Sequence, residues 1–181
     1  FAVFLFFQRN RIARERKRSD SLLRNILPTE VAEELKSSGR SEAKLYDNVT
    51  ILFTDFINFT GISAEMSPKE LVNEIHQNFT AFDEIISGWG VEKIKTIGDA
   101  YMAAGGLPIP MEGSVKNTVL VALEMQAFID NRKTEMDIAG KPAFEMRVGI
   151  HTGPVVAGIV GVKKFQYDIW GATVNTARRM E

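Results

Sequence analysis

Two aspartates carry the chemistry that the sequence suggests most directly. Asp55 ends an apolar and β-branched run, Val49 to Asp55, which predicts a buried strand. Asp99 lies in a two-residue turn between two further strand-like runs, 91–97 and 100–104. Taken alone, each residue is better interpreted as a capping or turn residue. Brought side by side, their like charges would repel and raise each other's pKa unless cations lay between them.

The order of the predicted elements decides whether these aspartates meet. A helix capped by Ser67 and Pro68 follows the first strand and runs to about residue 88. After the hairpin we expect a helix at about 115–134, strands at 144–150 and 153–160, and a helix at 172–180. The inner side of the helix at 115–134 is expected to carry Val119, Ala122, Leu123, Gln126 and Ile129.

This order predicts an α+β fold, a ferredoxin-like βαββαβ sheet with helices on one face. In that topology the first strand lies beside the hairpin. The end of the first strand and the hairpin tip then come together, and Asp55 and Asp99 become neighbours. Carboxylate oxygens suit Mg²⁺, which is usually held by one or two carboxylates together with substrate phosphates. Two such ions, about 3.5–4 Å apart, would drive phosphoryl transfer on a nucleotide.

The residues after Asp55 predict a phosphate-binding turn. A turn over Phe56 to Thr60 leads towards a helix, so its backbone N–H groups, including that of Phe59, could face phosphate oxygens. The Thr60 hydroxyl adds a donor. Asn58 stands where glycine would be more permissive.

Composition excludes several other kinds of site. The 181 residues contain no cysteine and only two histidines, so disulfides, thiolate zinc sites and cysteine nucleophiles are ruled out. The formal net charge is -1, and nothing in it predicts nucleic-acid binding.

The N-terminal segment precedes the alternating part. Residues 1–7 are all apolar, too few to span a bilayer, and a basic stretch from Arg9 to Arg18 follows. We interpret 1–7 as the cytoplasmic end of a transmembrane helix, with a soluble helix as the alternative. Residues 8–44 predict a helix, a break at Pro28 and a second short helix, either a transducer from an upstream sensor or a passive spacer. The catalytic domain is expected to span 45–181.

Four motifs resemble the class III nucleotidyl cyclases, nearest to the adenylyl type. They are FTDFINFT (53–60), EKIKTIGDAYMAAGG (92–106), RVGIHTGPVVAGIVG (147–161) and QYDIWGATVNTARRME (166–181). The segment RKRSDSLLRNILP (16–28) is similar to the transducing helix before the catalytic domains of membrane cyclases. The resemblance implies a membrane-anchored enzyme with a cytoplasmic catalytic domain that makes cyclic AMP for intracellular signalling.

The resemblance also implies roles for single residues. Asp55 and Asp99 match the pair that holds two Mg²⁺ or Mn²⁺ ions, with the Phe56 carbonyl as a further ligand. ATP would cyclise at the interface of a homodimer, where one subunit supplies the aspartates. The other subunit would supply Lys95 and Asp168 to select the purine, Asn175 to orient the ribose and Arg179 to stabilise the transition state.

The chemistry of Lys95 and Asp168 can be checked against the base. Adenine offers an N1 acceptor and an N6 donor, which a lysine donor and an aspartate acceptor complement. Guanine presents the reverse pattern and would favour glutamate at position 95, because unpaired buried polar groups make the wrong base costly. Without the resemblance, Lys95 reads as a strand residue reaching solvent and Asp168 as a turn residue.

Two other functions remain as alternatives, a guanylate cyclase and a non-catalytic dimerisation or signalling module on the same fold. The family continues past Glu181 with further strands and a phosphate-contacting lysine. We therefore read the C-terminal part as missing and expect weak or no activity from these 181 residues alone.

Overall fold

The computed structural model describes residues 2–161 and 165–181, with side chains described from residue 8 onward. The chain divides into two compact units. One comprises Phe1–Ala43 and Gly158–Tyr167, and the other Lys44–Ala157 and Asp168–Glu181. The predicted membrane end, 1–7, lies outside the residues whose side chains are described.

Two helices form the N-terminal part of the first unit. α1 spans Ala2–Arg24 and α2 spans Thr29–Ser38. The break falls at Pro28, as predicted, and Gly39 ends α2 in the left-handed conformation, with its N–H donating to the Leu35 carbonyl. An ion pair of 2.6 Å joins Lys36 Nζ to Asp20 Oδ1, so the two helices are tied together. Among the described residues, no helix has both the length and the apolar content that crossing a bilayer requires.

A five-stranded sheet runs through the second unit in the order β2-β3-β1-β4-β5. The strands are β1 (Lys44–Phe56), β2 (Val91–Ile97), β3 (Ala100–Gly105), β4 (Met146–Val160) and β5 (Gln166–Trp170). β1 is central, with β3 and β4 antiparallel on either side. The predicted α+β, ferredoxin-like fold is confirmed. The two strands expected at 144–150 and 153–160 are a single long strand, because β1 pairs along both parts of it.

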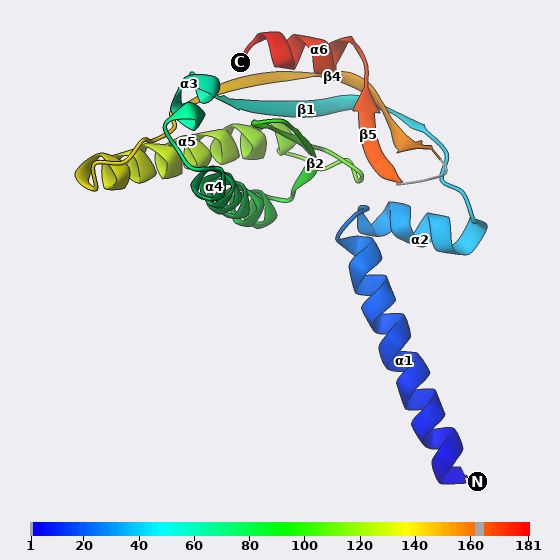
Figure 1. The fold of residues 1–181 in the computed structure, drawn as a ribbon. Helices are drawn as coiled ribbons and strands as arrows, with labels where there is room; N and C mark the ends of the chain where they lie inside the picture. The colour runs from blue at the N-terminus through cyan, green and yellow to red at the C-terminus, as the bar shows by residue number, and fades with distance from the viewer. Residues whose placement is uncertain (1, 162–164) are drawn as a thin grey trace. The chain divides into compact units, whose positions relative to one another are not determined.

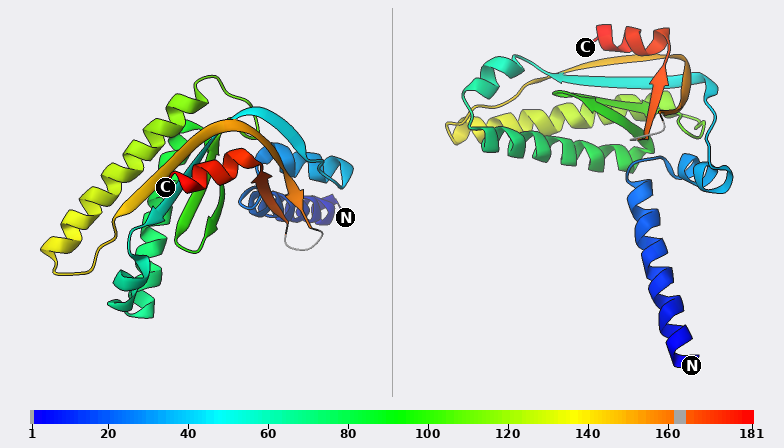
Figure 2. Two further views of the ribbon diagram at one scale, coloured as in Figure 1. Left: turned by 90° about the horizontal axis from the view of Figure 1, so that it is seen from above. Right: turned by 45° about the vertical axis from the view of Figure 1, so that its right-hand side comes forward.

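Helices cover both faces of the sheet. α4 (Pro68–Trp89) and α5 (Ser114–Ile138) lie on one face, as predicted, and the short α3 (Phe59–Ala64) follows β1. α6 (Ala172–Arg179) lies on the opposite face, so the prediction of helices on one face holds for α4 and α5 but not for α6, as the right-hand view of Figure 2 shows. Successive β1 side chains alternate between these faces. Figure 1 shows α4 and α5 below β1 and α6 above β4. Leu52 belongs to the core under α4 and α5, while the buried Ile51 is not part of that core and, by alternation, belongs to the other face.

The inner side of α5 differs from the prediction. Val119 and Leu123, expected to be buried, are 40% and 61% exposed. The buried residues of α5 are Ser114, Thr118, Val121, Ala122, Met125 and Ile129. A Cβ built on Gly105 would lie 2.3 Å from the Thr118 hydroxyl, so glycine lets the polar side of the helix approach β3 closely. The prediction therefore holds for Ala122 and Ile129, and the small residues Ser114 and Thr118 take the buried places expected for Val119 and Leu123.

The start of α4 has the predicted sequence signature. Ser67 caps the helix by accepting from the Glu70 N–H, and the Glu70 carboxylate accepts from the Ser67 N–H in return. Pro68 takes the first helical position. The Ser67 hydroxyl also donates to the Glu70 carboxylate at 2.5 Å, and this bond together with that from the Ser67 N–H lowers the pKa of the Glu70 carboxyl below its usual value. The start of α4 is thereby well defined on the helical face of the sheet.

Candidate active site

The fold brings the two aspartates together. Asp55 is near the end of β1, and Asp99 is in the turn between β2 and β3, with β3 paired directly to β1. The Asp99 carboxyl is within hydrogen-bonding reach of Asp55. Burial, the charge of Asp55 and this hydrogen bond together raise the pKa of Asp99. The structure therefore confirms the prediction that Asp55 and Asp99, 44 positions apart in the sequence, are neighbours in the fold.

Arg147 joins this pair from β4, a contact that sequence reasoning missed. Its register position in β4 is opposite Asp55, and Nη2 lies 2.7 Å from the Asp55 Oδ2 atom. The Glu181 carboxyl is close enough that, after burial, the charge of Asp55 also raises the Glu181 pKa. The end of the sheet thus gathers acidic groups around one guanidinium.

The acidic pair fits a divalent cation in its donor chemistry. Two carboxylates in contact with each other offer hard oxygen ligands, and a cation between them would relieve the repulsion that, after burial, raises the Asp99 pKa. Within the described residues, no group of three or more acidic or histidine side chains is arranged to hold a metal. Asp55 and Asp99 are therefore the side-chain ligands that the described residues could supply to a metal ion. Further ligands would come from nucleotide phosphates, water or backbone oxygens.

The turn after β1 has a left-handed backbone at Asn58, the position where the sequence indicated that glycine would be more permissive. Asn58 is the one non-glycine residue with positive φ (52°) among those described, and its carbonyl accepts from the Ile62 N–H at the start of α3. The Phe59 ring packs against Phe144, 5.5 Å between ring centroids, and against Phe56. Only the backbone of Phe59 is thus available to a ligand. Thr60 is exposed in the first turn of α3.

The buried Phe56 ring belongs to the same aromatic cluster. It stacks on Phe144 with centroids 4.7 Å apart, and this packing fixes the end of β1 beside Asp55. The suggested role of the Phe56 carbonyl as a metal ligand stays a prediction.

Lys95 and Asp168 form a direct ion pair. The Nζ and Oδ2 atoms are 2.5 Å apart, and the two side chains are only 26% and 14% exposed. Asp168 also accepts the Ile169 N–H at 2.8 Å, which fixes the carboxylate. The two residues come from β2 and β5, at opposite edges of the sheet order. The alternative interpretations, in which Lys95 reaches solvent and Asp168 is an ordinary turn residue, do not account for this ion pair.

Asn175 and Arg179 lie on α6 and are both exposed. The Arg179 Nε donates to the Asn175 carbonyl at 3.2 Å, so the side chain lies along the helix. α6 packs on the sheet through the buried Thr173 and Ala177. In the described part of the chain, no hydrogen bond or ion pair joins Asn175 or Arg179 to the two aspartates. These two residues therefore face outward, where a second molecule could meet them.

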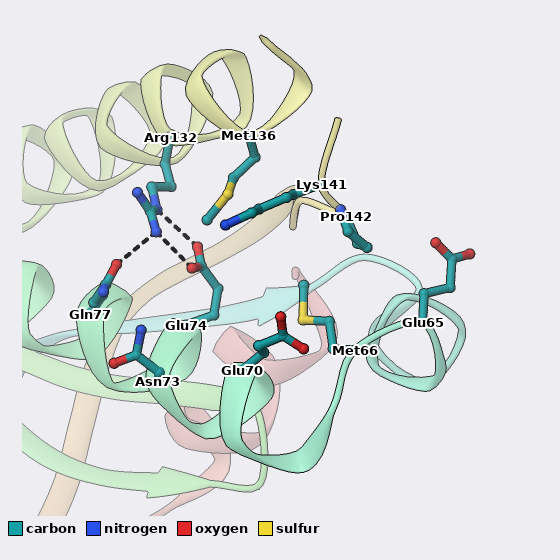
Figure 3. Close-up of a pocket in the computed structure, with 10 residues that line it drawn as sticks. All are labelled: Glu65, Met66, Glu70, Asn73, Glu74, Gln77, Arg132, Met136, Lys141 and Pro142. Carbon is teal, nitrogen blue, oxygen red and sulfur yellow. Dashed lines mark hydrogen bonds and ion pairs between the residues drawn. The ribbon is translucent and has the colours of Figure 1, made fainter. Parts of the chain in front are cut away.

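A cavity of about 260 Å³ lies elsewhere, between α4 and α5. Figure 3 shows the Arg132 guanidinium at its edge, hydrogen-bonded to Glu74 and Gln77. None of the predicted site residues lines this cavity. The bond between Arg132 Nη2 and Glu74 Oε2, 2.7 Å long, ties the two long helices together and carries no part of the candidate site.

The fold and these residues define a class of protein, and comparison with known proteins identifies it. The family of adenylate and guanylate cyclase catalytic domains matches residues 41–181, and the chain belongs to this family of class III nucleotidyl cyclases. Cyclase domains of this class act on nucleotides as dimers and use divalent metal ions.

Relatives of both base specificities are equally similar. The chain is 42% identical over 168 residues to an adenylate cyclase of Mycobacterium tuberculosis, covering 92% of this chain and 37% of the relative. It is also 42% identical over 173 residues to the receptor-type guanylate cyclase Gyc76C of Drosophila melanogaster, covering 94% and 11%. The chain thus spans a minor part of these relatives, and overall identity does not separate ATP from GTP.

Among solved structures, one similar protein is the catalytic core of a rhodopsin-guanylyl cyclase with converted specificity, in complex with ATPalphaS. The TM-score is 0.71 at 39% identity, with 78% of this chain and 74% of that chain covered.

Proposed function

We propose that this chain is the catalytic domain of an adenylate cyclase, which converts ATP to 3′,5′-cyclic AMP and pyrophosphate. The ribose 3′-oxygen forms a bond to the α-phosphorus and loses its proton. The bond from the α-phosphorus to the bridging oxygen breaks, and pyrophosphate leaves. The observation that carries this proposal is the Lys95–Asp168 pair.

Lys95 and Asp168 support ATP rather than GTP. The pair presents an ammonium donor and a carboxylate acceptor in a half-buried position, the pattern that adenine N1 and N6 require. Guanine would set its own N1–H donor against the lysine and leave polar groups unpaired, which is costly in a buried site. A guanylate cyclase is the second candidate, favoured by relatives such as Gyc76C.

Asp55 and Asp99 would hold two Mg²⁺ or Mn²⁺ ions. When bound, such ions stabilise the attacking and the leaving oxygen of an in-line displacement. The two carboxylates would hold the ions at the end of the sheet, and the backbone N–H groups of the turn at 56–60 would bind the phosphates. Thr60 adds a hydroxyl donor there.

A homodimer would complete the site. Asn175 and Arg179 are exposed, and within the described residues no hydrogen bond or ion pair joins them to the aspartates of their own chain. A second copy could bring them to Asp55 and Asp99, where Asn175 would orient the ribose and Arg179 would stabilise charge developing on the phosphate. Each dimer would then contain two equivalent sites.

The N-terminal segment would connect this domain to a membrane. The basic stretch from Arg9 to Arg18 suits an anionic cytoplasmic surface, and at least one relative is a receptor-type cyclase. We propose a membrane-anchored protein whose catalytic domain, residues 45–181, faces the cytoplasm. Residues 8–44 would then couple an upstream sensor to catalysis.

Complementation between two inactive variants of the full-length protein tests the proposed site. Asp55→Ala and Arg179→Ala should each be inactive, because each dimer then lacks one half of both sites. Equal mixing should restore about a quarter of the wild-type rate, since half of the dimers are mixed and have one complete site. Recovery of no activity would contradict the shared site. Formation of cyclic GMP in preference to cyclic AMP would contradict the base assignment.

A further inference from the structure

The two lysines of β2 point to opposite faces of the sheet. Lys93 pairs in register with Ala103, and Lys95 pairs with Met102, so the register shifts between them. Residues two apart share a face in a regular strand. The extra residue, Ile94, forms a β-bulge that separates the faces. Lys95 therefore reaches Asp168, while Lys93 reaches the helical layer.

Lys93 enters a compact network on that helical side. Its ammonium lies 2.7 and 2.9 Å from the two carboxylate oxygens of Asp83 on α4. The Tyr101 hydroxyl of β3 donates to the same carboxylate at 2.5 Å. The Lys93 ammonium also lies 4.9 Å from the centre of the Tyr101 ring. We call these three residues the Asp83 clamp.

The clamp is well ordered by its surroundings. Tyr101 is fully buried, and its ring packs edge-on against Phe82, with centroids 5.5 Å apart. Burial and the Asp83 carboxylate raise the pKa of Tyr101, so its hydroxyl remains a donor at neutral pH. Asp83 lies on the same well-capped helix, α4. Through Asp83, the helix holds two neighbouring strands of the hairpin at once.

The hairpin needs such a support because β2 is an edge strand. It pairs with β3 on one side only. The strand carries Lys95, and the hairpin tip carries Asp99. On one face, the Lys95–Asp168 pair holds β2, and that is the pair that a base would have to engage. On the other face, the Asp83 clamp holds it independently of any ligand.

We propose that Asp83 is a positioning residue that determines base specificity, because its clamp on Lys93 and Tyr101 fixes the bulged edge strand that presents Lys95. The proposal rests on the proposed function, in which Lys95 and Asp168 read adenine. Loss of the clamp leaves the Lys95 side chain itself unchanged but allows the strand that carries it to move. A lysine that samples several positions donates less selectively, so GTP is excluded less well.

The test compares Asp83→Asn and Tyr101→Phe with Glu74→Gln in the full-length protein. Glu74→Gln is a matched control, because it weakens another partly buried ion pair of α4, to Arg132, that does not touch the hairpin. The measured quantity is kcat/KM for ATP divided by kcat/KM for GTP. We expect this ratio to fall about tenfold in both clamp variants, because a displacement of 1 Å can cost about 100-fold in rate. The control should keep the wild-type ratio. Asp83→Glu, which retains the carboxylate, should have a ratio between those of Asp83→Asn and wild type.

Amide hydrogen exchange of residues 91–97 provides a readout that does not depend on catalysis. Exchange should rise in Asp83→Asn and Tyr101→Phe and stay unchanged in Glu74→Gln. Unchanged exchange, or a ratio within twofold of wild type in both clamp variants, overturns the proposal even if the protein melts at a lower temperature. A wild-type protein that prefers GTP, or a Lys95→Met variant with the wild-type ratio, contradicts the proposed function instead. Faster exchange in the clamp variants would then still support the clamp.

Discussion

Gly149 in β4 provides a direct test of how α6 is positioned. A Cβ built on Gly149 would lie 2.3 Å from the Ala177 carbonyl oxygen and 2.5 Å from the Glu181 nitrogen. Both are backbone atoms, so no side-chain rotation relieves the contact. Gly149→Ala must therefore move the C-terminal end of α6 away from the sheet. That end of α6 carries Arg179, one turn after Asn175.

The size of the effect follows from the distances. Ordinary van der Waals contact begins at 3.4 Å, so the helix must shift by about 1 Å. Overpacking of this kind costs about 1–3 kcal/mol. In a chain of this length, the melting temperature should fall by roughly 2–4 °C for each kcal/mol. A shift of 1 Å in the residues proposed to contact the reacting phosphate should lower kcat by about 100-fold.

The assay combines thermal melting with cyclic nucleotide formation in the full-length protein. Gly88→Ala is the matched control: Gly88 is helical in α4, and its added Cβ meets nothing within 4 Å. The control should be stabilised by up to about 1 kcal/mol and keep its activity. Wild-type melting and wild-type kcat in Gly149→Ala would refute the close approach of α6. Lower stability with unchanged kcat would refute the role of the helix in catalysis.

Three further predictions concern single side chains. Asp55→Asn should abolish the binding of Mn²⁺ with an ATP analogue, measured by calorimetry. Mutation of a residue that only supports a metal ligand already lowers metal affinity about 10–100-fold, and Asp55 is proposed as a direct ligand. Wild-type affinity would show that Asp55 is not part of the site. Arg147→Gln should raise the affinity for Mn²⁺, measured without nucleotide, by up to about fivefold. The reason is that Arg147 competes with the metal for Asp55, and an exposed ion pair of this kind is worth about 0.2–1 kcal/mol. A weaker affinity would show that Arg147 supports metal binding. The Glu70 carboxylate has a lowered pKa in the folded chain, so its contribution is present above the unfolded value of 4.5 and is lost on acidification. The urea midpoint of Glu70→Gln should lie below wild type at pH 7 and approach it below pH 4.5, and a constant gap would contradict the capping role.

The order of strands and helices could be predicted because its signals are local. Alternating apolar residues, a two-residue turn and a capped helix start each involve a few neighbouring positions. The meeting of Asp55 and Asp99 then followed from topology. The role of Lys95 depended on the family resemblance, since an isolated lysine in a strand has no distinctive signal. The structure adds that Asp168 pairs with it across the curled sheet.

Other contacts could not be predicted because they depend on register. The Arg147–Asp55 pair joins residues 92 positions apart and requires the alignment of β1 with β4. The bulge at Ile94 reverses the face that simple alternation assigns to Lys95 relative to Lys93. The predicted inner side of α5 was right for Ala122 and Ile129 and wrong for Leu123, because Thr118 packs closely on β3 instead. Each depends on distant parts of the chain.

Product analysis tests the central claim most directly. The full-length protein is incubated with equal ATP and GTP in the presence of Mn²⁺ or Mg²⁺, and cyclic AMP, cyclic GMP and pyrophosphate are quantified together. We predict that cyclic AMP is the main product, that it forms in equal amount to pyrophosphate, and that Asp55→Ala forms neither. Predominant cyclic GMP, or undiminished cyclic AMP from Asp55→Ala, would contradict an adenylate cyclase built on Asp55, Asp99, Lys95 and Asp168.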